Sequence, residues 1–454
     1  MPACAARPRY GLCFSLMNAL SLVVAVMTAF ICVGYEREIT TAAESIALPP
    51  ATPLPSDTAQ VTATIRLLEE KVKQNPDDFI AYTKLAGYYL QRQRETGSNE
   101  YLSLAGRAAR ASLAIVPPEQ NYSGLAVLAQ TEYALHDFAV ARAQALQLTN
   151  LASTKSVGLQ LLSDALVELG EYDSAQRVLD RMQSLGEKTT STQSRLGKYA
   201  LLRGRPQKAM HYLSEALVLA LEQTPPSREM VAWCRWQLGE TAFTVGDYAT
   251  AEQHYRDALV TFPGYWRASA ALARVRAARG DRTEAIAQYE QVVRVLPDLT
   301  FVAALGDLYY LAGREEQAVA QYTLVEQIAR LSTLSGTLYN RQLALFYADH
   351  DRKPEEAYAN AMKEYVVRKD IYGADAVAWT ALKFNKIAEA KHAIKEALRL
   401  GTRDARILYH AGMIAAATGE HMLARQYLTQ ALTLSPEFDP LQASIARKAL
   451  AAQK

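Results

Sequence analysis

Seven histidines and several acidic pairs are the residues of this sequence whose chemistry suits catalysis or metal binding. Zinc sites on a helix use two histidines four residues apart, because that spacing places both imidazoles on one face. No two histidines here have that spacing, and we expect no metal site. The histidines are His136, His211, His254, His350, His392, His410 and His421.

The acidic pairs and the cysteines lead to the same expectation. Each pair consists of sequence neighbours, which point to different sides of a helix and do not face a common substrate. Three of the four cysteines lie in or beside an N-terminal apolar segment, so Cys234 alone remains for the folded body, and we expect a packed free thiol there. The sequence also lacks the nucleophile-elbow, phosphate-loop and dinucleotide-binding glycine motifs. We therefore predict no catalytic residue and no cofactor.

The overall composition is that of an ordinary folded protein. Half of the residues are hydrophobic, and 49 basic residues against 47 acidic ones leave a formal charge of +2. Nucleic-acid-binding proteins usually carry a large basic excess. We therefore expect no nucleic acid as a partner.

The N-terminus carries an uncharged apolar run over residues 11–35, preceded by Arg7 and Arg9. About 20 apolar residues suffice to cross a bilayer, and signal peptides have shorter apolar regions of roughly 7–15 residues. The run predicts a transmembrane helix or signal anchor over 11–35 and a short cytoplasmic N-terminus over 1–10. Basic residues before the span favour export of everything after it, into the periplasm if the source is bacterial. Cleavage of the segment, which would release a secreted soluble protein, is the alternative.

Residues 36–60 are rich in proline, alanine and threonine. They follow neither the period of a helix nor that of a strand, and proline removes backbone donors. We expect this segment to be a linker between the membrane and the body.

A repeat with a period of 34 residues fills most of the remaining chain. "LGETAFTVGDYATAEQHYRDALVTFP" begins at Leu238, and "LARVRAARGDRTEAIAQYEQVVRVLP" begins at Leu272. Ten copies share a central alanine, which occurs as Ala105, Ala141, Ala175, Ala209, Ala251, Ala285, Ala318, Ala357, Ala390 and Ala424. Each copy also has an earlier small residue, in order Ala86, Ala129, Ser163, Gly197, Gly239, Ala273, Gly306, Ala344, Ala378 and Gly412.

These small residues predict a helical hairpin in each copy. Packed helices lie 8–10 Å apart depending on the side chains between them, so one small residue on each helix lets the pair approach closely. Glycines between the two halves, such as Gly246 and Gly280, suit the left-handed residue that ends a helix. Asp281 begins a capping sequence for the second helix. We expect an all-α solenoid over residues 61–436 and a C-terminal capping helix over 437–454.

The order of small residue, glycine turn, alanine, tyrosine and proline resembles the tetratricopeptide repeat family. The resemblance implies about ten stacked helix-turn-helix units in a right-handed superhelix, with a concave groove that binds a protein or peptide. It also implies that the first helix of each unit lines the groove. In the fifth to seventh copies the groove positions are Trp233, Trp236, Glu240, Phe243, Arg267, Arg274, Asp307 and Tyr310.

One alternative to this groove remains open. The two tryptophans could instead pack between adjacent copies, beside the insertion "EQTPPSRE". A partner would then be sought in the last copy, around Arg406, Tyr409 and Met413.

The function that these features predict is a non-catalytic interaction scaffold. It would be anchored in a membrane and would hold a protein or peptide ligand of unknown identity outside the cytoplasm. The alternative is an accessory or assembly factor of an envelope polysaccharide-export or secretion complex, which similar anchored repeat proteins serve.

Overall fold

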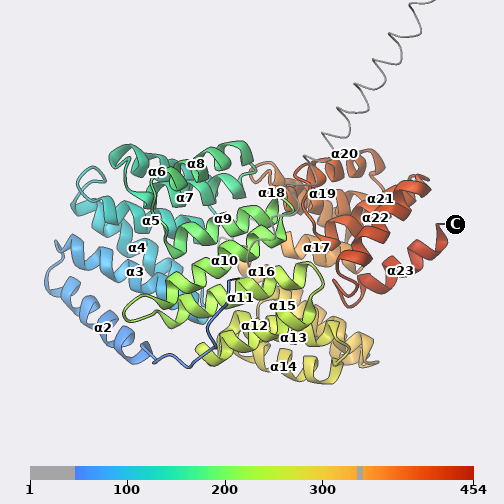
Figure 1. Cartoon of the computed structure of the whole chain (residues 1–454), viewed down its shortest axis with the longest axis horizontal. Helices are drawn as coiled ribbons and strands as arrows, with labels where there is room; N and C mark the ends of the chain where they lie inside the picture. The colour runs from blue at the N-terminus through green and yellow to red at the C-terminus, as the bar shows by residue number, and fades with distance from the viewer. Residues whose placement is uncertain (1–45, 335–340, 454) are drawn as a thin grey trace, which may run out of the picture. The chain divides into compact units, whose positions relative to one another are not determined.

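A computed structural model of the chain describes residues 46–334 and 341–453. The predicted transmembrane helix over 11–35 lies outside these residues. The chain divides into two units, 1–47 and 48–454, and the second is described from here on. Within the described residues, 22 helices account for all regular secondary structure (Figure 1). No helix among them is long and apolar enough to cross a membrane.

Twenty of these helices form ten consecutive antiparallel pairs, which we call copies one to ten. In chain order the pairs are α3 (Phe79–Thr96) with α4 (Glu100–Ile115), α5 (Tyr122–Ala134) with α6 (Phe138–Leu151), α7 (Ser156–Glu168) with α8 (Tyr172–Ser184), α9 (Thr190–Leu202) with α10 (Pro206–Leu221), α11 (Arg228–Thr244) with α12 (Tyr248–Thr261), α13 (Trp266–Ala278) with α14 (Arg282–Val295), α15 (Leu299–Leu311) with α16 (Glu315–Leu334), α17 (Arg341–Asp349) with α18 (Pro354–Tyr365), α19 (Ile371–Lys383) with α20 (Ile387–Leu398), and α21 (Ala405–Ala417) with α22 (His421–Leu434).

One further helix covers each end of the array. At the N-terminal end, α2 (Thr58–Gln74) buries Val61, Ile65 and Leu68 in the cluster that also holds residues of copy one. At the C-terminal end, α23 (Gln442–Ala452) buries Ala446 with residues of α21 and α22. The predicted all-helical array of helix pairs is thus confirmed.

The small residues lie where the two helices of a copy meet, as predicted. All ten central alanines are at most 1% exposed. A Cβ atom added to Gly239 would lie 2.4 Å from a ring carbon of Tyr255, and one added to Gly412 would lie 2.7 Å from Leu428. Only a residue without a Cβ fits beneath these side chains, because packed interiors leave no room for an additional carbon atom.

The turns between paired helices also have the expected backbone. Gly246 has a φ of 78°, and His136 and Asn385, which replace the glycine in two copies, have φ values of 65° and 58°. The carboxylate of Asp281 accepts a hydrogen bond from the amide of Glu284 at 3.3 Å and caps α14. The left-handed residue ends the first helix, and the cap starts the second.

Contacts also join copies that are far apart in sequence. The hydroxyl of Tyr172, in copy three, accepts a hydrogen bond from the amide of Ile371, in copy nine, at 2.8 Å. The hydroxyl of Tyr248, in copy five, accepts one from the amide of Glu437, beyond copy ten, at 2.8 Å. The paired residues are 199 and 189 positions apart, which is about six copies. Successive turns of the solenoid therefore touch each other.

Part of the predicted linker is packed against the body. Residues 48–57, which we call the strap, lie on α10, α11 and α12, and α2 begins directly after them. Leu48 and Leu54 pack against an apolar cluster of α10 and α11, and this contact holds the strap in place. The segment predicted as a linker, 36–60, therefore contains residues that pack on the body, and its residues 36–45 lie outside the described part.

Candidate functional site

The array contains a cavity of about 580 Å³. Its walls come from first helices, namely α11, α13, α15, α17 and α21, and from the loop before α23. Six of the eight predicted groove residues line it, namely Trp236, Glu240, Phe243, Arg267, Arg274 and Asp307. Arg406, from the second candidate surface, lines the same cavity. Residues of copies five to seven and of copies eight and ten line this cavity together, so Arg406 faces the same space as the six groove residues.

The other two groove residues lie elsewhere. Trp233 packs against the apolar clusters of α10 to α13, and Tyr310 is 57% exposed and does not line the cavity. Trp236 also contacts the cluster of α12 and α13. Trp233 therefore has the alternative role, which is packing between copies. Trp236 combines this packing with a place in the cavity wall.

Arg274 supports the wall of the cavity through an internal ion pair. Its guanidinium lies 2.7 Å from the carboxylate of Glu240 and 3.1 Å from the hydroxyl of Tyr255, and it covers the ring of Phe243 at 4.0 Å. Burial opposes the charge of Arg274, but the nearby Glu240 carboxylate outweighs it and raises the pKa of the guanidinium. Arg274 is thus a charged residue that is already paired.

A histidine and an aspartate connect copies seven and eight. The Nε2 atom of His350 lies 2.8 Å from Asp307, and its Nδ1 atom lies 2.7 Å from the carbonyl oxygen of Phe346. Asp307 also accepts a hydrogen bond from the hydroxyl of Tyr322 at 2.9 Å. Burial disfavours the charged imidazole, but the hydrogen bond to Asp307 outweighs this and raises the pKa of His350.

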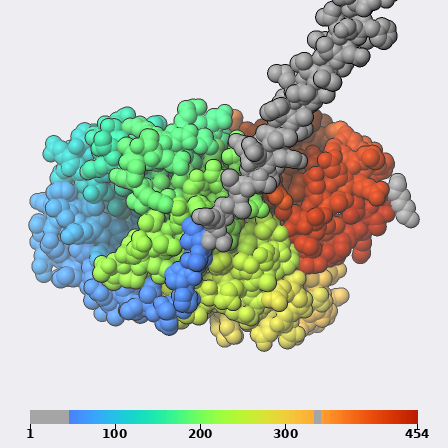
Figure 2. Space-filling view, in the orientation of Figure 1, coloured from blue at the N-terminus to red at the C-terminus, as the bar shows by residue number. Residues whose placement is uncertain are grey.

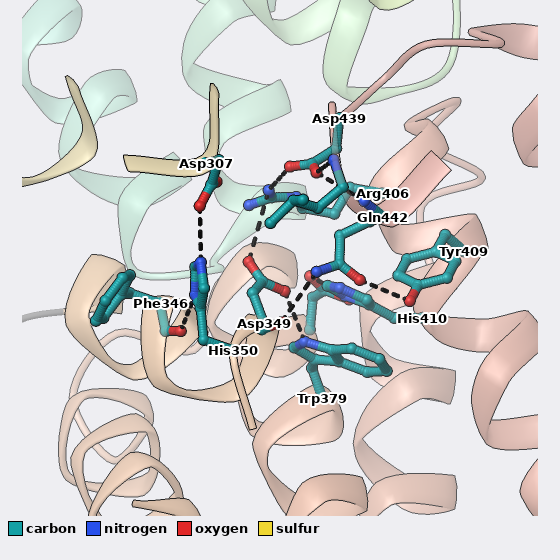
Figure 3. A network of polar contacts seen from close by, with 12 residues as sticks. Asp307, Phe346, Asp349, His350, Trp379, Arg406, Tyr409, His410, Asp439 and Gln442 are labelled. Atoms are coloured by element: carbon teal, nitrogen blue, oxygen red, sulfur yellow. Dashed lines mark hydrogen bonds and ion pairs between the residues drawn. The ribbon is translucent and has the colours of Figure 1, made fainter. Parts of the chain in front are cut away.

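A polar network around Arg406 holds the C-terminal wall together (Figure 3). Arg406 lies 2.7 Å from Asp439 and 3.7 Å from Asp349. The indole nitrogen of Trp379 donates a hydrogen bond to Asp349 at 2.9 Å, and the amide nitrogen of Gln442 donates to the carbonyl oxygen of Asp349 at 3.1 Å. The network joins copies eight, nine and ten to the C-terminal helix.

Only Arg406 of the second candidate surface reaches the cavity. Tyr409 is buried, and its hydroxyl donates a hydrogen bond to Gln442 at 2.8 Å. Met413 packs against the apolar cluster of α21, α22 and α23. These two residues stabilise the last copy and do not line the cavity.

Arg267 differs from the other arginines of the cavity. Its guanidinium carbon lies 4.1 Å from the ring centre of Trp266 and 5.4 Å from that of Trp236. No acidic side chain of the described ranges 46–334 and 341–453 lies within ion-pair distance of it. Two indole rings thus fix a guanidinium that has no acidic partner in this part of the chain.

A second cavity of about 240 Å³ lies beside the first. It is lined mainly by α7, α9 and α11, and Glu240 borders both cavities. Asp164 and Lys198 line it, and both follow the small residue of their copy by one position, as Glu240 does. We did not predict these two residues, although the same position in copies three and four would have identified them.

The described residues contain no group of three or more His, Cys, Asp or Glu side chains that could hold a metal ion. Cys234 is a buried free cysteine, as expected. Burial raises the pKa of its thiol, which disfavours the reactive thiolate.

Comparisons with known proteins identify the type of repeat. Models of the tetratricopeptide repeat match three segments of the chain. Two of them overlap, residues 188–259 and 242–300, and the third covers residues 377–437. None of the curated proteins matches the chain.

Solved structures that match this chain share little sequence with it. The Cut9–Hcn1 hetero-tetramer of the APC/C has 13% identity and a TM-score of 0.33, over 87% of this chain and 94% of the other. A tetratricopeptide repeat protein from Parabacteroides merdae has 14% identity and a TM-score of 0.38, over 53% and 92%. YrrB, described as having an unusual peptide-binding site, has 16% identity and a TM-score of 0.29, over 43% and 96%. Values this low carry no information about a partner of this chain.

Proposed function

We propose that this chain, which is a tetratricopeptide repeat protein, is a non-catalytic scaffold that holds an extended segment of a partner protein in the 580 Å³ cavity. The observation that carries the proposal is the meeting of two turns of the solenoid around one cavity. Six groove positions and Arg406 face the same space there.

The size and the lining of the cavity suit a short segment better than a folded domain. A volume of about 580 Å³ falls within the range of roughly 300–1,000 Å³ that small-ligand sites occupy. Its walls combine the rings of Trp236, Trp266 and Phe301 with Arg267. Large rigid rings and arginine contribute most of the contact energy in protein interfaces, so these four residues are the expected contacts.

The acidic side chains beside the histidines support a structural role over a catalytic one. Asp307 is shared between His350 and Tyr322, and the buried His410 lies 2.9 Å from Asp375 and is stacked on Trp379. Each pair joins neighbouring helices and is enclosed by aromatic rings. We infer that they serve packing.

We further propose that residues 11–35 anchor the chain in a membrane and that the repeats lie on the exported side. The uncharged run and the two preceding arginines support this. Protease added to intact spheroplasts should then degrade the repeats while cytoplasmic marker proteins remain whole. Protection of the repeats would contradict the proposal.

Site-specific photo-crosslinking in the cells that produce the protein tests the scaffold function. The photoreactive amino acid benzoylphenylalanine would replace Gln342, an exposed residue that lines the cavity. The control position is Met422, which is 84% exposed on α22 and does not line it. A discrete cross-linked product from position 342 that position 422 does not give is the expected result. The same products from both positions, or none from position 342, would contradict the proposal.

A further inference from the structure

The strap contacts the body at every third residue. Leu48, Ala51, Leu54 and Asp57 are half-buried, whereas all residues between them are exposed. A polyproline II helix has three residues per turn and no internal hydrogen bonds, and four of the ten strap residues are prolines. The burial pattern is therefore that of a polyproline II segment with one face on the body. Figure 2 shows the strap as a blue segment on the green surface of α10 to α12.

The face beneath the strap is apolar, and a charged residue, Arg228, lies at one end of it. Leu48 and Leu54 pack against a cluster that includes Leu213, Leu217 and Leu238. At the C-terminal end of the strap, Asp57 forms an ion pair with Arg228 at 3.1 Å. The two leucines are six residues apart, which is roughly 19 Å in a polyproline II helix.

The buried guanidinium of Arg235 needs hydrogen-bond acceptors at this face. Its side chain is only 2% exposed, and one terminal nitrogen donates a hydrogen bond to the carbonyl oxygen of Pro49 at 3.2 Å. The other terminal nitrogen pairs with Asp257 at 3.3 Å, and its Nε atom has no hydrogen-bond partner within the described residues. A buried guanidinium needs acceptors, because leaving its donors unpaired is unfavourable. The strap supplies one of them.

The backbone of the strap needs few partners in return. The amide of Leu54 donates a hydrogen bond to the carbonyl oxygen of Thr261 at 3.4 Å. The four prolines have no amide hydrogen to satisfy. A proline-rich segment is also largely extended before it binds, so it loses little conformational entropy on this face.

We propose that this face of α10, α11 and α12 is a binding site for extended proline-rich segments with an apolar residue at every third position. The strap occupies the site in the same chain, and a partner segment of this pattern competes with it. The face is separate from the lining of the 580 Å³ cavity, so this proposal does not depend on the scaffold function proposed above.

The test compares two forms of the full-length chain, in detergent, with one synthetic peptide. The substitutions Leu48→Asp and Leu54→Asp release the strap without changing the site itself. A fluorescein-labelled peptide with the sequence of residues 46–58 is then titrated, and its anisotropy is measured. The released variant should bind the peptide saturably. Wild type should bind at least about tenfold more weakly, because a short tether holds the strap at an effective concentration in the millimolar range.

A control peptide carries the same two aspartates and should bind neither form. A second released variant, Pro50→Gly with Pro53→Gly, changes only exposed strap residues and weakens the strap by making its unbound state more flexible. This variant should also bind the 46–58 peptide of unchanged sequence more tightly than the wild-type protein does. The proposal is overturned if neither variant binds the peptide saturably, if wild type binds it as tightly as they do, or if the control peptide binds equally. Cross-linking at Gln342 is unaffected by these outcomes.

Discussion

The helix crossing in copy five predicts different effects on stability for the same substitution at two glycines. An alanine at Gly239 would place its Cβ atom 2.4 Å from a ring carbon of Tyr255, a side chain that is fully buried. An alanine at Gly87, also in a first helix, would meet no atom within 4 Å. Within a helix, alanine is favoured over glycine by about 1 kcal/mol at both positions.

Because the helix preference is common to both substitutions, their difference measures the packing alone. Forcing an additional carbon into a filled core typically costs about 1–3 kcal/mol. We therefore expect Gly87→Ala to stabilise the protein by up to about 1 kcal/mol and Gly239→Ala to be about 1–3 kcal/mol less stable than Gly87→Ala.

Urea unfolding of the two variants and of wild type, followed by circular dichroism, gives both free energies if the slope with urea is unchanged. Equal stabilisation by both substitutions would show that Gly239 does not lie at a tight helix crossing. That result would refute the packing account of the repeated small residues.

Three further predictions follow from packing and charge. Ala251→Leu should destabilise the array by about 1–3 kcal/mol, and an unchanged unfolding temperature would place this alanine outside the helix crossing. Arg368→Ala should cost about 3 kcal/mol, because it leaves the buried carboxylates of Glu364 and Asp370 without one of their partners; a urea midpoint equal to that of wild type would contradict this. The pKa of His350 is raised on folding above its ordinary value of 6.5, so its pair with Asp307 stabilises the protein fully below about pH 6.5, and this stabilisation is lost as the pH rises through the raised pKa. Unfolding midpoints between about pH 6 and pH 8 should therefore fall less in His350→Gln than in wild type, and equal slopes would contradict the assignment.

The helix pairs could be predicted because their determinants are local. Gly239 and Tyr255 are 16 residues apart, and the same spacing separates Ala273 from Tyr289 and Gly306 from Tyr322. Because this spacing repeats along the chain, such contacts can be predicted from a single sequence. The central alanines and the turn residues could therefore be predicted from the sequence.

The cavity and the docked strap depend on contacts that do not repeat along the sequence. Tyr172 and Ile371 meet across 199 residues, and nothing in either stretch marks the other as its partner. Arg406 was consequently predicted as part of a separate surface, although it faces the same cavity as Arg274. The composition of the strap indicated a linker, but the spacing of Leu48, Ala51 and Leu54 was a usable signal for a docked polyproline segment.

The most direct test of the scaffold account fills the cavity and leaves the fold intact. Ala304 lines the cavity and is half-buried, so a tryptophan at this position enters open space. With benzoylphenylalanine at position 342, Ala304→Trp should abolish the cross-linked product while the unfolding temperature stays within a few degrees of wild type. Retention of the same product at the same yield would show that no partner segment occupies the cavity.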